Sequence, residues 1–397
     1  MWKKRLTALG LALAVCVCGC SQAGTAQKNE AKDEKQQLVL WAYYETQAQR
    51  DGLDKLINDF NQSQKEYEAS WEYVPMTGFI KGLSSAYTED NLPDMAILDN
   101  PDTLPMIQLG LLEDITDEAK EWKLEKNYYS SIVQTVKYKD HYYGLPFNCN
   151  STALIYNKKM FENAGVEIPE TWDEFRMTVK KLTTDHTDGF TMCGMDGEQG
   201  AFQILSWLLA AGATTDQLLH TDACQDTFSF FDELLTDGSM SENCINLTQT
   251  DIAREFVKGK TAIMQNGPWV FPMLDESGID YGIFPIPDKE EGQETEKAVL
   301  GGENLVVLKD KNTEGSVKFL EFCMKGDDLL KFCEEASVLP TKVSDAEKMA
   351  AKNEKVKVFE KQMEHAVSRT SVGSWTSTAQ QLTDDLYGLV EKKSISD

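Results

Sequence analysis

Histidine is scarce in this sequence, and the few that occur are not arranged for chemistry. The 397 residues include four histidines: His141, His186, His220 and His365. None stands at the His-x-x-x-His or His-x-Glu spacing that brings two metal ligands, or a ligand and a general base, together. The sequence therefore argues against a metal centre and against histidine-based catalysis, and no cofactor is expected.

The glycine-rich loops that bind phosphates are also missing. Gly259-Lys260-Thr261 resembles the end of a phosphate-binding loop, but Arg254 stands where that loop needs its first glycine. The Gly-x-Ser-x-Gly turn of serine hydrolases and the Gly-x-Gly-x-x-Gly fingerprint of dinucleotide-binding proteins do not occur. These absences argue against a nucleotide-dependent enzyme and against a serine hydrolase.

Positive charge is in short supply. Lysine and arginine number 39 against 65 aspartates and glutamates, which gives a formal net charge of −26. Such a chain is repelled by nucleic acids and by anionic lipids, so neither is expected as a partner.

Closely spaced cysteines are lacking as well. Three of the nine cysteines precede residue 21, and the other six are Cys149, Cys193, Cys224, Cys244, Cys323 and Cys333. No pair among these six has the Cys-x-x-Cys spacing of zinc or thioredoxin-type sites. Buried free thiols are the default in a large domain, although the sequence leaves open whether any pair forms a disulfide.

The N-terminus has the features of a secretory signal. Basic residues at 3–5 precede an apolar run from Leu6 to Val17, which is too short to span a bilayer. Val17-Cys18-Gly19-Cys20 resembles a lipobox, in which the last cysteine is acylated after cleavage. We expect residues 1–19 to be a signal peptide, Cys20 to carry a lipid, and residues 20–37 to be a flexible tether. Plain secretion with cleavage nearby is the alternative.

The first part of the folded chain alternates strands and helices. Leu38–Glu45, Ala69–Pro75 and Leu92–Asp102 read as strands, and a helix with one apolar face lies between the first two. This order predicts an α/β fold with a parallel sheet, in which ligands bind at the carboxyl ends of the strands. Tyr43, Glu45, Asp99 and Asn100 occupy such ends; for Asp99 an N-cap role is equally favoured.

A crossover segment follows at 142–157. Two strand-like halves flank a polar run that includes Asn148 and Asn150. Pro146 lacks a backbone donor, which favours a strand that is leaving its sheet. We interpret the segment as a crossing between two lobes with amides at the crossing; an edge strand followed by a loop is the alternative.

Three blocks carry a resemblance to a known family. They are Tyr143–Pro146 with Leu154–Lys158 and Pro169–Phe175, then Phe256–Trp269, and then Gly301–Val307. In this order and spacing they resemble bacterial extracellular solute-binding proteins of the sugar-transport class, which are maltose-binding-protein-like. The resemblance covers essentially the whole chain after the tether.

The resemblance implies a two-lobe periplasmic-binding-protein-like fold of type II, with a hinge between the lobes and the ligand cleft at their interface. Lobe 1 is expected to comprise 38–147 with 300–342, and lobe 2 to comprise 148–299 with 343–397. The crossings are expected near 147–152, 288–300 and 340–346. The family usually continues with another short helix, so the resemblance suggests that the C-terminus is abbreviated.

The resemblance also implies a carbohydrate site. Aromatic rings stack on the apolar faces of a pyranose, while carboxylates and amides bind its hydroxyls. Composition alone favours a core position for Trp207, and a packing role for Trp269 stays open; the resemblance moves both toward the cleft. The predicted ligand contacts are Tyr43, Glu45, Asp99, Asn100, Asn148, Asn150, Trp207, Trp269, Gly302, Glu303 and Trp375.

The implied function is that of a receptor that captures a sugar, with an oligosaccharide favoured by the number of aromatic candidates, and delivers it to an ABC-transporter permease. Its partners are then the sugar, the permease subunits and, through the lipid, the outer face of the membrane; a monomer is expected. A glycoside-active enzyme with Glu45, Asp99 and Glu303 as carboxylates, and a sugar-sensing receptor without transport, are the alternatives.

Overall fold

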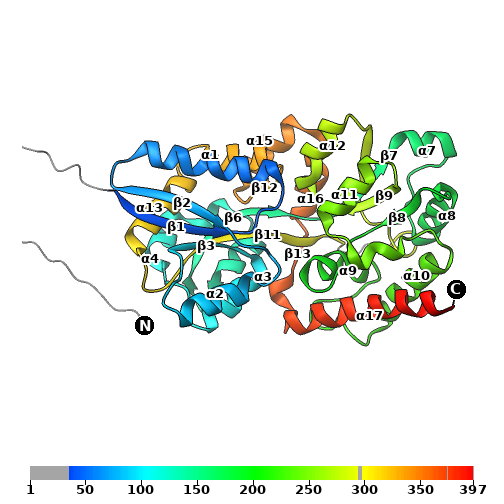
Figure 1. Ribbon diagram of the computed structural model, residues 1–397, viewed down its shortest axis with the longest axis horizontal. Coiled ribbons are helices and arrows are strands. Elements are labelled where there is room, and N and C mark those ends of the chain that lie inside the picture. The colour runs from blue at the N-terminus through cyan, green and yellow to red at the C-terminus, as the bar shows by residue number, and fades with distance from the viewer. Residues whose placement is uncertain (1–34, 294–296, 373, 397) are drawn as a thin grey trace, which may run out of the picture. The chain divides into compact units, whose positions relative to one another are not determined.

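The computed structural model describes residues 35–293, 297–372 and 374–396. The predicted signal peptide, Cys20 and most of the predicted tether lie outside this part of the chain. Two sheets, each covered by helices, form the two lobes of a mixed α/β fold (Figure 1).

The first sheet has seven strands in the order β12-β6-β11-β3-β1-β2, and β13 pairs with β11. The strands are β1 (Gln36–Ala42), β2 (Tyr67–Tyr73), β3 (Met95–Asp99), β6 (Gly144–Asn150), β11 (Val299–Val307), β12 (Leu339–Pro340) and β13 (Val367–Ser368). Strands β1, β2 and β3 are parallel, as predicted. Strand β11 runs antiparallel to both β3 and β6, so the sheet is mixed rather than parallel.

Strand β6 does not lie at an edge of the sheet, so the alternative of an edge strand followed by a loop is wrong, whereas the chain does leave the first sheet after this strand. It pairs with β11 on one side and with β12 on the other. Its pairing with β11 shifts register between Glu303 and Asn304, so that Asn304 faces Pro146 while Glu303 faces Asn148. Proline is tolerated inside a sheet at such an irregularity because a ladder hydrogen bond is missing there in any case.

The helices of the N-terminal third and of the segment after β11 surround the first sheet. They are α1 (Gln47–Ser63), α2 (Phe79–Thr88), α3 (Asn100–Gln108), α4 (Thr116–Trp122), α5 (Leu124–Asn127), α6 (Ser130–Val133), η1 (Gln134–Val136), α13 (Thr313–Met324), α14 (Asp328–Ala336) and α15 (Val343–Lys352). Helix α1 buries Leu53, Leu56, Ile57 and Phe60, the apolar face expected from their spacing. Between η1 and β6 in the sequence, β4 (Lys137–Tyr138) and β5 (His141–Tyr142) form a small antiparallel hairpin.

The second sheet has four strands in the order β10-β7-β9-β8. They are β7 (Ala153–Asn157), β8 (Asp188–Thr191), β9 (Thr261–Asn266) and β10 (Tyr281–Phe284). The chain thus passes from the first sheet to the second between β6 and β7, and returns between β10 and β11. The predicted limits of the two lobes and the hinge remain a prediction.

The remaining helices lie in the sequence between the strands of the second sheet or in the C-terminal part of the chain. They are α7 (Lys158–Ala164), α8 (Trp172–Leu182), α9 (Glu198–Ala210), α10 (Asp222–Thr236), η2 (Glu242–Asn246), α11 (Gln249–Val257), η3 (Pro268–Val270), α12 (Phe271–Ser277), α16 (Glu354–Met363), η4 (Arg369–Ser371) and α17 (Trp375–Ser396). In Figure 1 the C-terminal helix α17, drawn in red, runs along α9 and α10.

All six cysteines that follow the predicted tether are buried free thiols. The default expectation from the sequence is therefore confirmed. Burial alone raises the pKa of such thiols; that of Cys193, for example, rises to about 12, so these thiols are not reactive nucleophiles.

Candidate functional site

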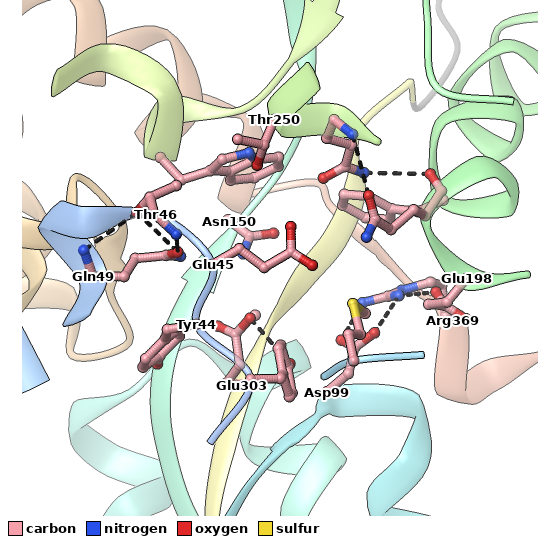
Figure 2. A pocket seen from close by; sticks show the side chains of 17 residues that line it. Tyr44, Glu45, Thr46, Gln49, Asp99, Asn150, Glu198, Thr250, Glu303 and Arg369 are labelled. Carbon is pink, nitrogen blue, oxygen red and sulfur yellow. Dashed lines mark hydrogen bonds and ion pairs between the residues drawn. The ribbon is translucent and has the colours of Figure 1, made fainter. Parts of the chain in front are cut away.

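A cavity of about 100 Å³ lies where the two lobes meet, and 17 residues line it (Figure 2). The first lobe contributes the segment after β1 with the start of α1, together with residues of β3, β6 and β11. The second contributes the first turns of α9 and α11 and the η3 turn. The lining residues are Tyr43, Tyr44, Glu45, Thr46, Gln49, Met76, Asp99, Asn150, Glu198, Gln199, Phe202, Gln249, Thr250, Trp269, Gly302, Glu303 and Arg369.

Strand pairing brings three of the predicted polar residues into one row. Glu303 on β11 lies opposite Asp99 on β3 and opposite Asn148 on β6. Residues that face each other on neighbouring strands project from the same face of the sheet. Two carboxyl groups and an amide, which lie far apart in the sequence, are therefore neighbours: the carboxyl groups line the cavity and the Asn148 amide lies behind them.

Glycine makes this row possible. Gly302 has a φ of +118°, and a β-carbon there would lie 2.3 Å from the carbonyl oxygen of Asn148. A side chain at this position would force β6 and β11 apart. Gly302 is a predicted ligand contact; in the structure it lines the cavity, and its lack of a side chain is what allows β6 and β11 to pair there.

Glu303 is a buried carboxyl group of the cavity with one free oxygen atom and a strongly raised pKa. Its Oε1 accepts a hydrogen bond from the Tyr43 hydroxyl at 3.2 Å, while its Oε2 has no partner among the described residues. Burial, and then the negative charge of Asp99, raise the pKa of Glu303 to about 8. The Asn148 amide lies near enough to favour the charged form, but it donates to the Tyr44 hydroxyl at 2.9 Å.

Asp99 is already fully engaged. Its Oδ1 accepts from the backbone N–H of Asn100 at 2.9 Å, which makes Asp99 the N-cap of α3. Both of its oxygens also accept from the Arg369 guanidinium, at 2.7 and 2.9 Å. The alternative N-cap role is therefore confirmed, and Asp99 has little acceptor capacity left for a ligand.

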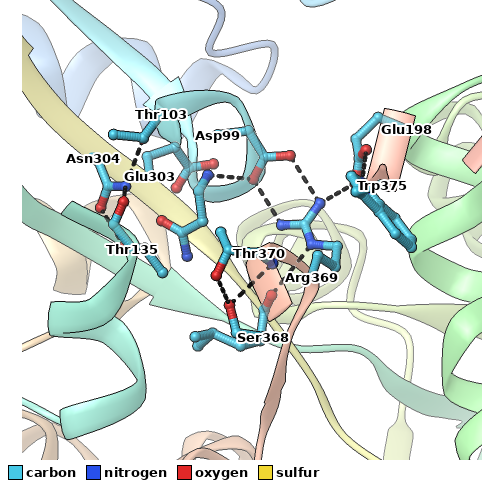
Figure 3. Close-up of polar contacts among 12 residues, drawn as sticks. Asp99, Thr103, Thr135, Glu198, Glu303, Asn304, Ser368, Arg369, Thr370 and Trp375 are labelled. Atoms are coloured by element: carbon cyan, nitrogen blue, oxygen red, sulfur yellow. Dashed lines mark hydrogen bonds and ion pairs between the residues drawn. The ribbon is translucent and has the colours of Figure 1, made fainter. Parts of the chain in front are cut away.

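Arg369 connects the two lobes (Figure 3). It is 2% exposed, pairs with Asp99 from the first lobe, and forms a second, short ion pair with Glu198 at the start of α9. The ring of Phe202 lies 4.6 Å from the guanidinium carbon. Glu198 also accepts from the indole N–H of Trp375 at 2.6 Å. Burial raises the pKa of Glu198 to about 7, although Arg369 opposes that rise.

Trp269 contributes the one tryptophan ring among the lining residues. It is 9% exposed, and its ring covers Gly267, where a β-carbon would lie 1.9 Å from the ring. A glycine two residues before the tryptophan is thus needed for the ring to turn back over the chain. Most of the ring is packed, and the remainder faces the cavity.

Seven of the eleven predicted contacts line the cavity: Tyr43, Glu45, Asp99, Asn150, Trp269, Gly302 and Glu303. Glu45 is partly exposed and burial raises its pKa. Figure 2 shows it between Thr250 and Glu303.

The other four predicted contacts lie behind the cavity wall. Asn100 is buried and follows Asp99 in the sequence, and both of its side-chain amide atoms lack a partner among the described residues. Asn148 is buried and faces Glu303 on the neighbouring strand. Trp375 is held against Glu198. Trp207 is fully buried among the rings of α8 and α10, and its indole N–H donates to Gln265 at 2.9 Å. The structure thus places Trp207 in the core, as composition alone favoured.

Sequence reasoning missed several lining residues, of which Glu198, Phe202 and Arg369 matter most. Helix periodicity could have indicated two of them: Glu198 and Phe202 are four residues apart and share one face of α9. Trp207 comes nine residues after Glu198, which places it on the opposite face. Nothing in the local sequence around Arg369 indicates an ion pair with a residue 270 positions away.

No helix in the described part of the chain has both the length and the apolar character to cross a membrane. Over the same residues, His, Cys, Asp and Glu side chains form no group of three or more that could hold a metal ion.

The family model described as "Bacterial extracellular solute-binding protein" matches residues 55–359. The chain belongs to this family. A "Multiple sugar-binding protein" of Streptococcus mutans is 23% identical over 359 residues, which cover 83% of this chain and 81% of that protein. An "sn-glycerol-3-phosphate-binding periplasmic protein" of Agrobacterium fabrum is 23% identical over 316 residues, which cover 72% and 69%.

The fold is shared with solved structures of solute-binding proteins. An ABC transporter solute-binding protein of Thermotoga lettingae, bound with α-D-tagatose, superposes with a TM-score of 0.81 at 22% identity, over 90% of this chain and 95% of that one. The two-lobe fold and the family predicted from the three sequence blocks are therefore confirmed. Members of this family are extracellular binding proteins, which accords with the secretory signal expected from the sequence.

Proposed function

We propose that this protein is the carbohydrate receptor of an ABC importer, which binds a sugar between its lobes without changing it chemically and delivers it to the permease. The observation that carries the proposal is the meeting of one tryptophan ring with carboxyl and amide groups in a single interlobe cavity. Trp269 supplies the ring, and Glu45, Asn150 and Glu303 supply the polar groups.

This combination suits a pyranose. The part of Trp269 that faces the cavity can stack on the apolar C–H face of the sugar. Carboxylate oxygens accept charge-assisted hydrogen bonds from hydroxyl groups, and the Asn150 amide can both donate and accept. The Streptococcus mutans relative, which is named for binding multiple sugars, supports the same ligand class.

The size of the cavity supports a hinge. Small-molecule sites usually measure about 300–1,000 Å³, whereas this cavity has about 100 Å³. An oligosaccharide therefore needs the lobes to separate before it can enter. Arg369 and its partners from the two lobes are the contacts that opening would break.

We further propose that Cys20 is acylated and that the chain beyond it tethers the protein to the outer face of the cytoplasmic membrane as a monomer. Two observations support this. In the first 20 residues, basic residues precede an apolar run that ends in Gly19-Cys20, and the family is extracellular. A receptor held there can bind solute outside the cell and pass it to the membrane-embedded permease.

A thermal-shift panel of neutral mono- and oligosaccharides on the purified full-length protein tests the proposal. A sugar present at a hundred times its Kd should stabilise the folded state by about 2.7 kcal/mol. The same sugar, radiolabelled, should be recovered unchanged after incubation, and deletion of the protein should abolish its uptake by cells. Turnover of the sugar, or normal uptake without the protein, would contradict the importer role.

A further inference from the structure

One carboxyl group of the cavity has an oxygen atom that no neighbouring group engages. Among the described residues that line the cavity, Glu303 Oε2 is the one buried side-chain oxygen or nitrogen atom without a hydrogen-bond partner. A buried acceptor without a partner is unfavourable, so a ligand that fills this part of the cavity gains by bringing donors.

The positive charge in the cavity is already committed. Among the described lining residues, Arg369 is the one cationic side chain, beside the four carboxyl groups of Glu45, Asp99, Glu198 and Glu303. Its guanidinium donates twice to Asp99, once to Glu198, and through Nε to the carbonyl of Leu300 at 3.3 Å. Four of the five N–H donors of an arginine are thereby used. No two neighbouring N–H groups remain free to bind a phosphate or carboxylate of the ligand together.

Two further arginines lie near the mouth of the cavity, but each has a partner. Arg50 donates to the carbonyl of Tyr44 at 2.9 Å, and Arg254 pairs with Asp251 at 2.7 Å. Both favour the charged form of Glu45, and neither lines the cavity. They therefore oppose, without cancelling, the rise that burial causes in the pKa of Glu45.

We infer that the ligand presents hydroxyl or ammonium donors to Glu303, and that solutes carrying a phosphate or carboxylate are rejected. The inference rests on the proposed function and narrows it: the sugar is neutral or carries a protonated amine. An anion in this cavity would face a surplus of carboxylates at low dielectric without a free cationic donor.

Proton linkage separates the two permitted classes. The groups that face Glu303 come from several elements: Tyr43 and Tyr44 from the segment after β1, Asp99 from β3, Asn148 and Cys149 from β6, Cys333 from α14 and Arg369 from η4. Because the pKa of Glu303 is about 8 in the empty protein, its carboxyl group is mostly protonated at pH 7. A protonated amine that pairs with Glu303 stabilises the carboxylate and releases a proton. A neutral hydroxyl stabilises it less, and its binding depends less on pH.

Calorimetric titration of the full-length protein with probes that share a glycosidic linkage but differ in charge tests the inference. Maltose and digalacturonate share an α-1,4 linkage, whereas cellobiose and fully deacetylated chitobiose share a β-1,4 linkage. Glucose 1-phosphate, glycerol 3-phosphate and spermidine complete the set. We expect at least one neutral or amine-bearing disaccharide to bind, and every anionic probe to bind at least 100-fold more weakly than it does. An anionic probe within tenfold of the best neutral or amine-bearing sugar would overturn the inference.

The non-sugar probes keep the two proposals apart. Binding of spermidine without binding of any sugar would overturn the proposed function while upholding the charge selection. Binding of glycerol 3-phosphate without any sugar would overturn both.

A pair of variants locates the selection. Glu303→Gln should weaken the amine-bearing disaccharide at least tenfold more than its neutral counterpart. Glu121→Gln removes the same charge from an exposed position on α4 and should change neither. Equal loss for both disaccharides in Glu303→Gln would contradict a role of this carboxylate in charge selection; should the variant not fold, the panel on the unaltered protein decides the inference by itself.

Discussion

Replacing Arg369 with methionine should destabilise the protein strongly, because it removes the cation that two buried carboxyl groups share. Asp99 and Glu198 would stay in place, 5% exposed in the case of Asp99, without a compensating charge. Breaking a buried ion pair from one side costs about 3–5 kcal/mol. With an unfolding entropy of about 2.1 cal/mol/K per residue over roughly 360 residues, the midpoint of thermal unfolding should fall by about 4–7 °C.

The loss should depend on pH in a defined direction. Without Arg369, the pKa of Glu198 rises further, because the attraction that favoured its charged form is gone. At pH 5 Glu198 takes up a proton and the penalty shrinks, whereas at pH 8 it either stays charged in the interior or takes up a proton at a cost in free energy. The difference from the unaltered protein should therefore be larger at pH 8 than at pH 5.

Thermal unfolding followed by circular dichroism at the two pH values measures this. Arg176→Met is the matched control: Arg176 also pairs with two carboxylates, Glu233 and Asp237, but its side chain is 37% exposed. Exposed pairs contribute about 0–1 kcal/mol, so the control should lose little at either pH. An unchanged midpoint for Arg369→Met at pH 8, or a loss equal to that of the control, would refute the buried-pair reasoning.

Three further variants test other parts of the account. Trp269→Ala should weaken sugar binding by about 1–3 kcal/mol in a calorimetric titration, through loss of the stacked ring; unchanged affinity with lower stability would show the ring to be core only. Glu303→Gln should be more stable than the unaltered protein at pH 8, by up to about 5 kcal/mol, and similar at pH 5. The reason is that a folded-state pKa of about 8 destabilises the unaltered protein as the pH rises from about 4.5 to about 8; parallel pH profiles in denaturant unfolding would contradict this. Cys20→Ala should release the protein into the medium or block its processing, as fractionation will show; a normally processed, membrane-bound form would rule out acylation at Cys20.

Strand ends were the most productive local signal in the sequence. Tyr43, Glu45 and Asp99 follow buried strands, and the structure brings all three to the cavity because parallel strands end at one edge of the sheet. The crossover segment located Asn150, and the blocks that carry the family resemblance located Trp269, Gly302 and Glu303. The sequence did not reveal that β11 runs antiparallel between β3 and β6, and this pairing is what sets Glu303 opposite both Asp99 and Asn148.

Long-range pairing explains what could not be predicted. The polar segment around Arg369 gives no local sign of burial, and its partners come from β3 and α9. Trp207 was moved toward the cleft by resemblance alone, although counting nine residues from Glu198 places it on the far face of α9. Local periodicity would have been the better guide for that residue.

Small-angle X-ray scattering of the full-length protein, with and without the sugar that gives the largest thermal shift, tests the central claim most directly. A sugar bound between the lobes makes all of its contacts only when both lobes surround it, so the empty protein should sample open arrangements and the loaded protein should be closed. The account predicts that the radius of gyration falls on addition of the sugar. An unchanged scattering curve at saturation, with binding confirmed by calorimetry, would contradict binding by closure of the two lobes.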